Sequence, residues 1–255
     1  MNQGKTRVSI VNYTNTLPFK WALKRSRVLN RIDLQEDIPS ICAEKLKFGQ
    51  VELALVPVAL LPELDKYKIV SDYCIGAEGK VDTVKLYSRV PVQQIKSISL
   101  DYQSKTSNAL VRVLFKAHWK QNVQFKAALP GFERSVADDH GIVVIGDRCF
   151  GLNGTFEYEY DLAEEWKKLT GLPFVFAAWV AVEEQDQGVI EEFNTVLKDG
   201  LSQLSKAVEE SETPPQLSKA QTLHYLQARI SYDLDAKKRE ALKLFLSNLA
   251  DLPAL

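Results

Sequence analysis

The sequence predicts an α/β fold with two lobes. Short apolar runs of strand length alternate with longer stretches whose apolar residues recur at helical spacing, and this alternation is typical of α/β proteins. Residues 89–178 contain strands and helices of their own. We therefore expect residues 89–178 to form one lobe, residues 1–88 and 179–255 to form the other, and a ligand cleft to lie between them.

The first lobe is expected to begin with a strand over residues 7–12 that ends in a polar turn. Pro18 follows the turn and opens a helix, since proline is tolerated in a first helical turn. Residues 32–38 alternate between apolar and polar, which indicates a half-buried strand. Residues 51–58 are almost continuously apolar, as in a parallel strand buried on both faces. The lobe is completed by a helix over 39–48 and a strand over 81–90.

The second lobe repeats this alternation. Its clearest helix is expected over residues 107–119, where Leu110, Val113 and Leu114 fall on one face. A second helix is expected over 161–169, and strands are expected over 97–101, 124–129, 141–145 and 173–182. Three helical stretches follow, over about 187–210, 215–229 and 235–250.

The composition excludes several classes of protein. Lys and Arg number 32 against 33 Asp and Glu, without the basic excess of a nucleic-acid-binding protein. No apolar stretch reaches the roughly 20 residues of a membrane span, and no secretory signal opens the chain. Cys42, Cys74 and Cys149 are far apart and are expected to be buried free thiols. These features indicate a cytoplasmic protein without a nucleic-acid or membrane partner, and they leave its oligomeric state undetermined.

No cofactor or metal ion is expected. The sequence contains neither a dinucleotide-binding G-x-G-x-x-G nor a phosphate-binding G-x-x-x-x-G-K-[ST]. The three histidines are not spaced as metal ligands, and no G-x-S-x-G motif indicates a serine hydrolase. The chemistry that the sequence offers is therefore polar and neutral.

Four short polar runs, over residues 12–19, 104–107, 145–147 and 161–177, lie at the exits of apolar runs. Open α/β sheets bind ligands where their strands end, so we expect these runs to form one pocket. The hydroxyl groups of 104–107 are either helix N-caps or part of an anion site at a helix N-terminus. Two such sites on opposite lobes would suit a small dianion with separated carboxylates. Asp147 is either a catalytic acid or base or a cap on the following turn.

Taken together, these runs resemble the chorismate dehydratase family of the futalosine route to menaquinone. Its members open with a Leu-Asn-Thr-Leu-Pro-like turn, matched at 14–18, and continue with a Val-x-Ser-Val-x-Leu-x-Ser strand, matched at 81–88. A Ser-x-Thr-Ser helix start, an Ile-Gly-Asp and an Asp-Leu-x-x-x-Trp…Thr-Gly-Leu-Pro-Phe-Val-Phe-Ala stretch then follow in the same order. Four residues depart from the pattern: Thr83 replaces a serine, Thr14 replaces a leucine, and Arg148 and Cys149 stand where small residues are commoner.

The resemblance implies a two-lobed fold like that of the type II periplasmic binding proteins. It also implies that water is eliminated from chorismate to give 3-[(1-carboxyvinyl)oxy]benzoate, without a metal or an organic cofactor. The implied catalytic residues are Asn15, Thr83 and Asp147, and the implied substrate-binding residues are Thr16, Ser104, Thr106, Ser107 and Gly146. Either the substrate's own enolpyruvyl carboxylate or Asp147 takes the proton.

Two other functions are consistent with the same fold. One is that of the sister enzyme that makes 1,4-dihydroxy-6-naphthoate, but its Ser-Pro-Cys-Pro-Asn-Asp-Thr opening is replaced here by Asn-Tyr-Thr-Asn-Thr-Leu-Pro. The other is that of a non-catalytic solute-binding protein in the cytosol, although such proteins normally carry an export signal. A chorismate dehydratase therefore remains the preferred expectation.

Overall fold

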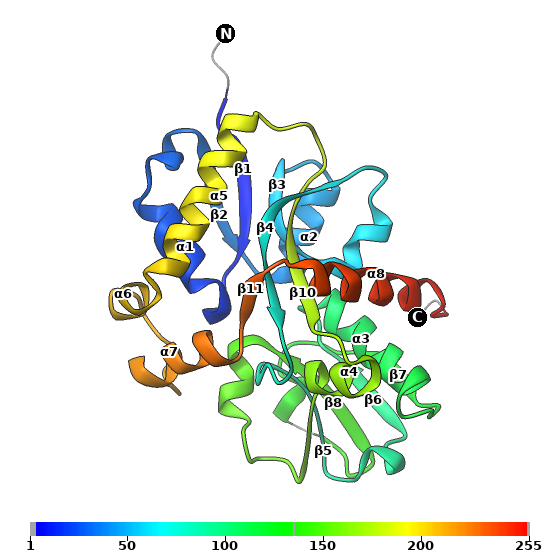
Figure 1. Ribbon diagram of the computed structural model, residues 1–255. Coiled ribbons are helices and arrows are strands. Elements are labelled where there is room, and N and C mark those ends of the chain that lie inside the picture. The colour runs from blue at the N-terminus through cyan, green and yellow to red at the C-terminus, as the bar shows by residue number, and fades with distance from the viewer. Residues whose placement is uncertain (1–3, 135, 254–255) are drawn as a thin grey trace.

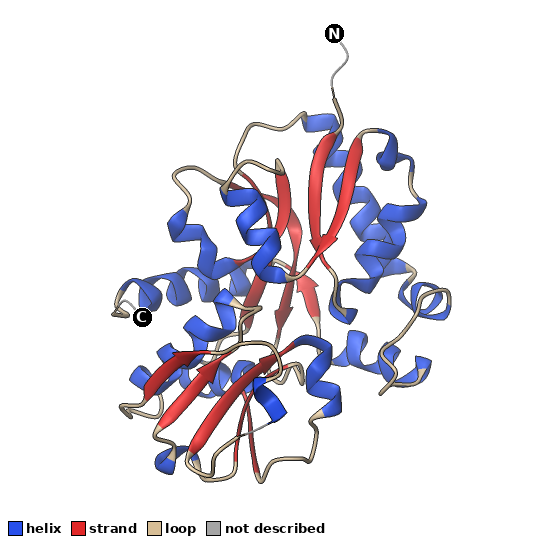
Figure 2. Cartoon of the chain, turned by 180° about the vertical axis from the view of Figure 1, so that it is seen from behind, coloured by secondary structure: helices blue, strands red, loops and turns tan. Residues whose placement is uncertain are grey.

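The computed structural model describes residues 4–134 and 136–253 and contains two separate sheets. The six-stranded sheet lies in the upper half of Figure 1 and the five-stranded sheet in the lower half. Figure 2 shows from behind that helices lie against both groups of strands. The predicted α/β fold with two lobes is confirmed.

The six-stranded sheet has the order β11-β4-β10-β3-β1-β2. Its first three strands along the chain run parallel to one another, whereas β10 runs antiparallel to both β3 and β4. Every residue of β10 is buried, as its continuous apolar sequence predicts. The strands are β1 (Thr6–Val11), β2 (Ile32–Asp37), β3 (Leu53–Pro57), β4 (Lys68–Ala77), β10 (Phe174–Ala181) and β11 (Ser231–Asp233).

Helices from both ends of the chain cover this sheet. Helix α1 (Leu17–Arg25) packs against α5 (Gln187–Ser202), and Gly200 allows their close approach, since an added Cβ would lie 2.3 Å from the carbonyl oxygen of Pro18. The C-terminal helix α8 (Ala236–Ala250) lies across the middle of the molecule and contacts both β10 and helix α3 (Lys105–Ala117) of the second lobe. The remaining helices of this lobe are α2 (Pro39–Lys47), α6 (Leu204–Glu209), α7 (Lys219–Ala228) and α8 (Ala236–Ala250).

The five-stranded sheet has the order β7-β6-β8-β5-β9, in which β6 runs parallel to β7 and β8, and β5 runs antiparallel to β8 and β9. Helix α3 (Lys105–Ala117) buries the apolar face expected from its sequence and packs against α4 (Leu162–Thr170). The strands are β5 (Val84–Ser88), β6 (Ser97–Leu100), β7 (Gln124–Ala127), β8 (His140–Ile145) and β9 (Tyr158–Asp161).

The chain passes between the two sheets at residues 78–83 and again at residues 171–173. The expected lobe boundaries at 88/89 and 178/179 do not coincide with these crossovers. Strand β5 lies in the second sheet, and β10 lies wholly in the first. The expected boundaries were misplaced because both strands are buried along their whole length, and the sequence gives no sign of which sheet they join.

The ten-residue strand β4 was not expected from the sequence. Its pairing with β10 shifts register twice, between Val175 and Ala177 and between Ala178 and Val180. Such irregularities break the regular alternation by which a strand is predicted. The short strands β9 and β11 were also unexpected, and the helix expected over 187–210 is divided into α5 and α6.

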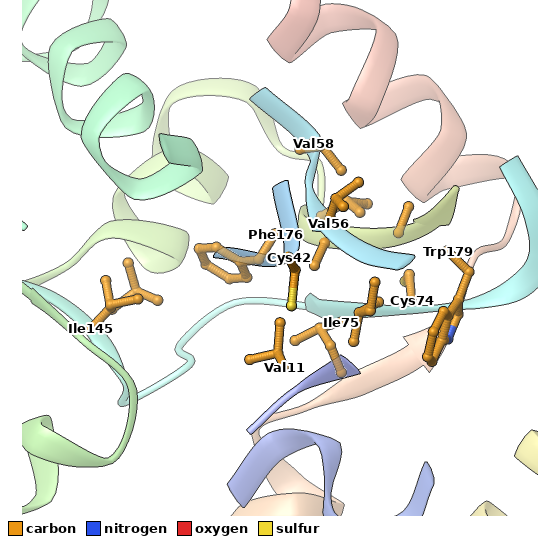
Figure 3. Close-up of a cluster of buried hydrophobic side chains, with 14 of the residues drawn as sticks. Val11, Cys42, Val56, Val58, Cys74, Ile75, Ile145, Phe176 and Trp179 are labelled. Carbon is orange, nitrogen blue, oxygen red and sulfur yellow. The ribbon is translucent and has the colours of Figure 1, made fainter. Parts of the chain in front are cut away.

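The apolar core extends from the first sheet towards the second lobe. Figure 3 shows Trp179 and Cys74 at one end of this cluster and Phe176 and Ile145 at the other, where the two lobes meet. Trp166 is also fully buried. The three cysteines are buried and free, as expected. The polar residues between the lobes therefore lie against this apolar core.

Candidate active site

A pocket with an empty volume of about 520 Å³ lies where the two lobes meet, and we call it the inner pocket. Nine of its lining residues are apolar: Val11, Pro39, Pro57, Ile75, Val81, Val84, Ile145, Phe176 and Ala177. The others are Tyr13, Asn15, Thr83, Ser104, Thr106, Ser107 and Gly146. The structure thus brings together six of the eight site residues that the sequence predicts; the other two, Thr16 and Asp147, do not line the inner pocket.

One wall of the inner pocket is the 3₁₀ turn Thr14–Thr16, which follows β1. The hydroxyl of Thr16 is fully buried and donates to the carbonyl oxygens of Val11, at 2.5 Å, and Tyr13, at 2.8 Å. Thr16 therefore holds the turn together instead of facing a ligand. The hydroxyl of Tyr232 donates to the backbone oxygen of Asn15 at 3.0 Å.

The side chain of Asn15 is left free by these contacts. Its Oδ1 atom is buried and has no hydrogen-bond partner among residues 4–134 and 136–253. A buried polar atom without a partner costs free energy, so few persist in folded proteins unless a ligand or water satisfies them. The amide of Asn15 is therefore suited to contact a ligand in the inner pocket.

The opposite wall is the start of helix α3, in the second lobe. Ser104 is its N-cap, with Oγ accepting from the backbone N–H of Ser107 at 3.0 Å. The hydroxyl of Thr106 accepts from the N–H of Ala59 at 3.2 Å and donates to the carbonyl oxygen of Phe176 at 3.0 Å. Thr106 thus ties the second lobe to the first. The start of α3, which is the positive end of its dipole, lines the inner pocket and favours an anion there.

Thr83 enters the inner pocket from the first crossover. Its hydroxyl lies 2.8 Å from that of Tyr225 and shares a hydrogen bond with it. Burial raises the pKa of Tyr225 well above its ordinary value, so this hydroxyl stays protonated. The crossover itself is fixed by Asp161, whose Oδ2 accepts from the N–H groups of Val81, at 2.9 Å, and Asp82, at 2.7 Å. Neither Tyr225 nor Asp161 was predicted as a site residue.

Asp147 faces a different space. Its two carboxylate oxygens each accept from the backbone N–H of Thr14 at 3.2 Å. The side chain lines a second, more open hollow of about 1200 Å³, which we call the outer hollow and whose lining includes Lys20, Trp21 and Glu36. Burial raises the pKa of the Asp147 carboxyl above its ordinary value, although Thr14 and Lys20 oppose the shift. Asp147 therefore binds the turn Thr14–Thr16 of the first lobe, and the expected cap on the turn that follows it is not formed.

Gly146 lies at the edge of the inner pocket and continues the pairing of β5 with β8. Its N–H donates to the carbonyl oxygen of Thr83 at 2.9 Å, and its φ of +68° is a conformation that glycine adopts without strain. Behind it, the buried carboxylate of Asp101 accepts from the N–H of Ile145 at 2.9 Å and pairs with Arg148. This ion pair, which the sequence did not predict, holds the ends of β6 and β8 together.

The inner pocket is uncharged. Its sixteen lining residues include no Lys, Arg, His, Asp or Glu. An anion bound there would be stabilised by neutral donors and by the α3 dipole. Among the described residues, no three or more His, Cys, Asp and Glu side chains gather as metal ligands, and no helix is long and apolar enough to cross a membrane.

Two of the similar solved structures have the same fold. A crystal structure of a protein from Archaeoglobus fulgidus matches with a TM-score of 0.75 at 15 % identity, covering 98 % of each chain. The periplasmic aliphatic sulphonate binding protein of Escherichia coli matches with a TM-score of 0.61 at 15 % identity, covering 97 % of this chain and 93 % of that one. The predicted periplasmic-binding-protein-like fold is confirmed.

Sequence comparison identifies the family. The chorismate dehydratase of Thermus thermophilus is 24 % identical over 258 residues, which cover 93 % of each chain. The chorismate dehydratase of Campylobacter jejuni is 28 % identical over 180 residues, which cover 69 % of this chain and 67 % of that one. A family model described as menaquinone biosynthesis matches residues 6–251. The chain therefore belongs to the menaquinone biosynthesis family.

Proposed function

We propose that this protein is a cytoplasmic chorismate dehydratase, which removes water from chorismate to give 3-[(1-carboxyvinyl)oxy]benzoate. Two relatives carry that name, and the inner pocket has an uncharged lining with several hydroxyl and amide side chains that such a reaction can use. The observation that carries the proposal is the unpartnered Oδ1 of Asn15, which lies across the inner pocket from the start of helix α3. Oδ1 can accept from the C4 hydroxyl of chorismate and Nδ2 can donate to a carboxylate, so the substrate could engage both walls at once.

The elimination needs little from the protein besides positioning. The proton leaves ring carbon C3, its electron pair forms the new ring double bond, and the C4–O bond breaks. The proton and the departing hydroxide together make water, and the ring becomes aromatic. Asn15, Thr83 and the first turn of α3 would hold the two carboxylates and stabilise the charge that develops on the ring carboxylate.

The proton acceptor is proposed to be the enolpyruvyl carboxylate of the substrate. A general base must come within hydrogen-bond reach of the proton that it takes. No carboxylate lines the inner pocket, and that of Asp147 is engaged by Thr14 on the side of the outer hollow. The substrate's own carboxylate is carried into the inner pocket with the ring.

The direct test is to incubate the purified protein with chorismate and to follow the loss of the diene absorbance, with the product identified by mass. We expect stoichiometric conversion to an aromatic product that is lighter by one water. An unchanged chorismate spectrum at high protein concentration would contradict the proposal.

The likeness to solute-binding proteins supports a second candidate, binding without chemistry. The same experiment separates the two functions when a calorimetric titration is added. Heat of binding with an unchanged diene spectrum would favour the binding protein, whereas heat followed by loss of the diene would favour the enzyme.

A further inference from the structure

Tyr13 separates the inner pocket from the outer hollow. It lines both spaces, which have empty volumes of about 520 Å³ and 1200 Å³. No other residue in the described parts of the chain is shared by the two linings. The aromatic ring of Tyr13 therefore lies between the space that would hold the substrate and a larger neighbouring hollow.

The ring rests on Gly146. A Cβ added to Gly146 would lie 2.7 Å, 2.8 Å and 2.9 Å from three carbons of the Tyr13 ring. Real Cβ atoms do not approach that closely, so any other residue at position 146 would displace the ring. Tyr13 comes from the turn after β1 in the first lobe, whereas Gly146 follows β8 in the second.

The hydroxyl of Tyr13 is held by the second lobe as well. It donates to Oε1 of Gln103, in the loop between β6 and α3. Gln103 is fixed in turn, since its backbone N–H donates to Asp101 at 2.9 Å and its Oε1 also accepts from Arg148 at 3.3 Å. The Asp101–Arg148 pair thus holds the acceptor of Tyr13 in place.

We propose that the ring of Tyr13 covers the inner pocket from the first lobe to the second, and we call it the roof. The ring packs on Gly146, which we call the seat, and its hydroxyl is held by Gln103, which we call the latch. The roof keeps water from the reacting ring and bounds the size of ligand that the inner pocket accepts. Ligand exchange with the outer hollow requires the ring to leave its seat. Tyr13 is in this sense a positioning residue, and the catalytic consequence of the inference rests on the proposed function.

A thiol placed under the roof tests the inference without any substrate. Ser107 lines the inner pocket and is 2 % exposed, so Ser107→Cys is expected to react slowly with a small maleimide. Adding Tyr13→Ala should speed this labelling at least about tenfold, because the reaction no longer depends on the opening of the ring. Adding Tyr13→Phe should speed it only a few-fold, the effect of losing one hydrogen bond while the ring stays on Gly146. The unsubstituted protein corrects for labelling of the three buried cysteines.

Gly146→Ala is the matched test of the seat, and it should raise the labelling rate of Ser107→Cys as Tyr13→Ala does. Gly49→Ala is its control, because Gly49 has nearly the same backbone, φ +67° against +68°, with nothing within 4 Å of an added Cβ. It introduces the same strain and should leave the labelling rate unchanged. Equal effects of the two alanines would overturn the role of the seat.

The expected effect of Tyr13 on the reaction kinetics rests on the proposed function. Tyr13→Phe should raise the KM for chorismate a few-fold and leave kcat nearly unchanged, since the ring still covers the inner pocket. If wild type does not consume chorismate but the labelling rates follow the expected order, the proposed function is wrong and the roof stands. If Tyr13→Ala leaves the labelling of Ser107→Cys unchanged, the roof is wrong even where chorismate is consumed.

Discussion

The two walls of the inner pocket differ in what they offer a ligand, although the hydroxyls of both walls bind the backbone. In the turn of the first lobe, the hydroxyl of Thr16 is bonded to the backbone, and the amide oxygen of its neighbour Asn15 has no partner. At the start of α3, the hydroxyls of Ser104 and Thr106 are bonded to the backbone. The first wall thus offers a ligand a specific side chain, whereas the second mainly offers the end of a helix.

The difference teaches that neighbours in one motif need not share a role. Asn15 and Thr16 are adjacent, yet only Asn15 faces the inner pocket. Thr106 lines the inner pocket, yet its hydroxyl joins the two lobes. Substitutions should therefore separate loss of activity from loss of stability, residue by residue, and the following experiments are ordered by the size of the expected effect.

Asn15→Ala should have the largest effect on activity. Loss of one preorganised hydrogen-bonding group is expected to lower kcat/KM by roughly 10²-fold or more. The melting temperature should not fall, because Oδ1 has no partner to lose among the described residues. Asn12→Ala is the matched control, since Asn12 lies beside the same turn but lines the outer hollow. Equal losses of activity in both variants would contradict the distinction between the two spaces.

Thr106→Val should mainly reduce stability. It leaves the N–H of Ala59 and the carbonyl oxygen of Phe176 without their partner in a buried place, at a cost of about 1–3 kcal/mol. Urea denaturation measures this loss, and Thr106→Ser should recover most of it because the hydroxyl returns. A valine variant as stable as wild type would show that Thr106 does not tie the lobes together.

Ser104→Ala and Ser107→Ala form a pair on the second wall. The N-cap of α3 is Ser104, so Ser104→Ala should lower the free energy of unfolding by about 1 kcal/mol. Ser107→Ala keeps that cap, since Ser107 contributes its backbone N–H to it. It should therefore preserve stability and raise the KM for chorismate. The opposite pattern, with Ser107→Ala the less stable of the two, would be inconsistent with this capping.

Asp147→Asn should have the smallest effect on turnover. If the substrate's carboxylate is the base, kcat falls by far less than the roughly 10²–10⁴-fold that loss of a general base costs. A collapse of kcat with chorismate still bound would instead make Asp147 the base.

The raised pKa of Asp147 also predicts that the stability of the protein depends on pH. Its raised pKa means that the folded protein holds this proton more tightly than the unfolded chain does. The contribution of Asp147 to the free energy of unfolding should therefore fall as the pH rises through its titration. Urea denaturation across the acidic range measures this contribution as the difference between wild type and Asp147→Asn, which should shrink as the pH rises.

The sequence predicted the two-lobed α/β fold and most of the inner pocket because these depend on local patterns. Asn15, Ser104 and Gly146 each stand at the end of a strand or the start of a helix, where a ligand site is expected. The boundary between the lobes and strand β4 were not predicted, since both depend on pairing between distant segments and on two shifts of register.

The side chains that support the site were also missed, for a related reason. Tyr225 reaches Thr83 from a helix 142 positions later, and Arg148 meets Asp101 across two strands. Such partners leave no spacing signal in the sequence. Thr16 and Asp147 were assigned to the site from their positions in motifs. Their contacts show that both side chains instead form hydrogen bonds with backbone groups.

A crystal structure of the protein with 3-[(1-carboxyvinyl)oxy]benzoate tests the central claim most directly. We expect the product in the inner pocket, with one carboxylate at the start of α3 and a hydrogen bond of about 3 Å to the amide of Asn15. Asp147 should still accept from Thr14. A product bound in the outer hollow beside Asp147, with no hydrogen bond from Nδ2 of Asn15, would contradict the account.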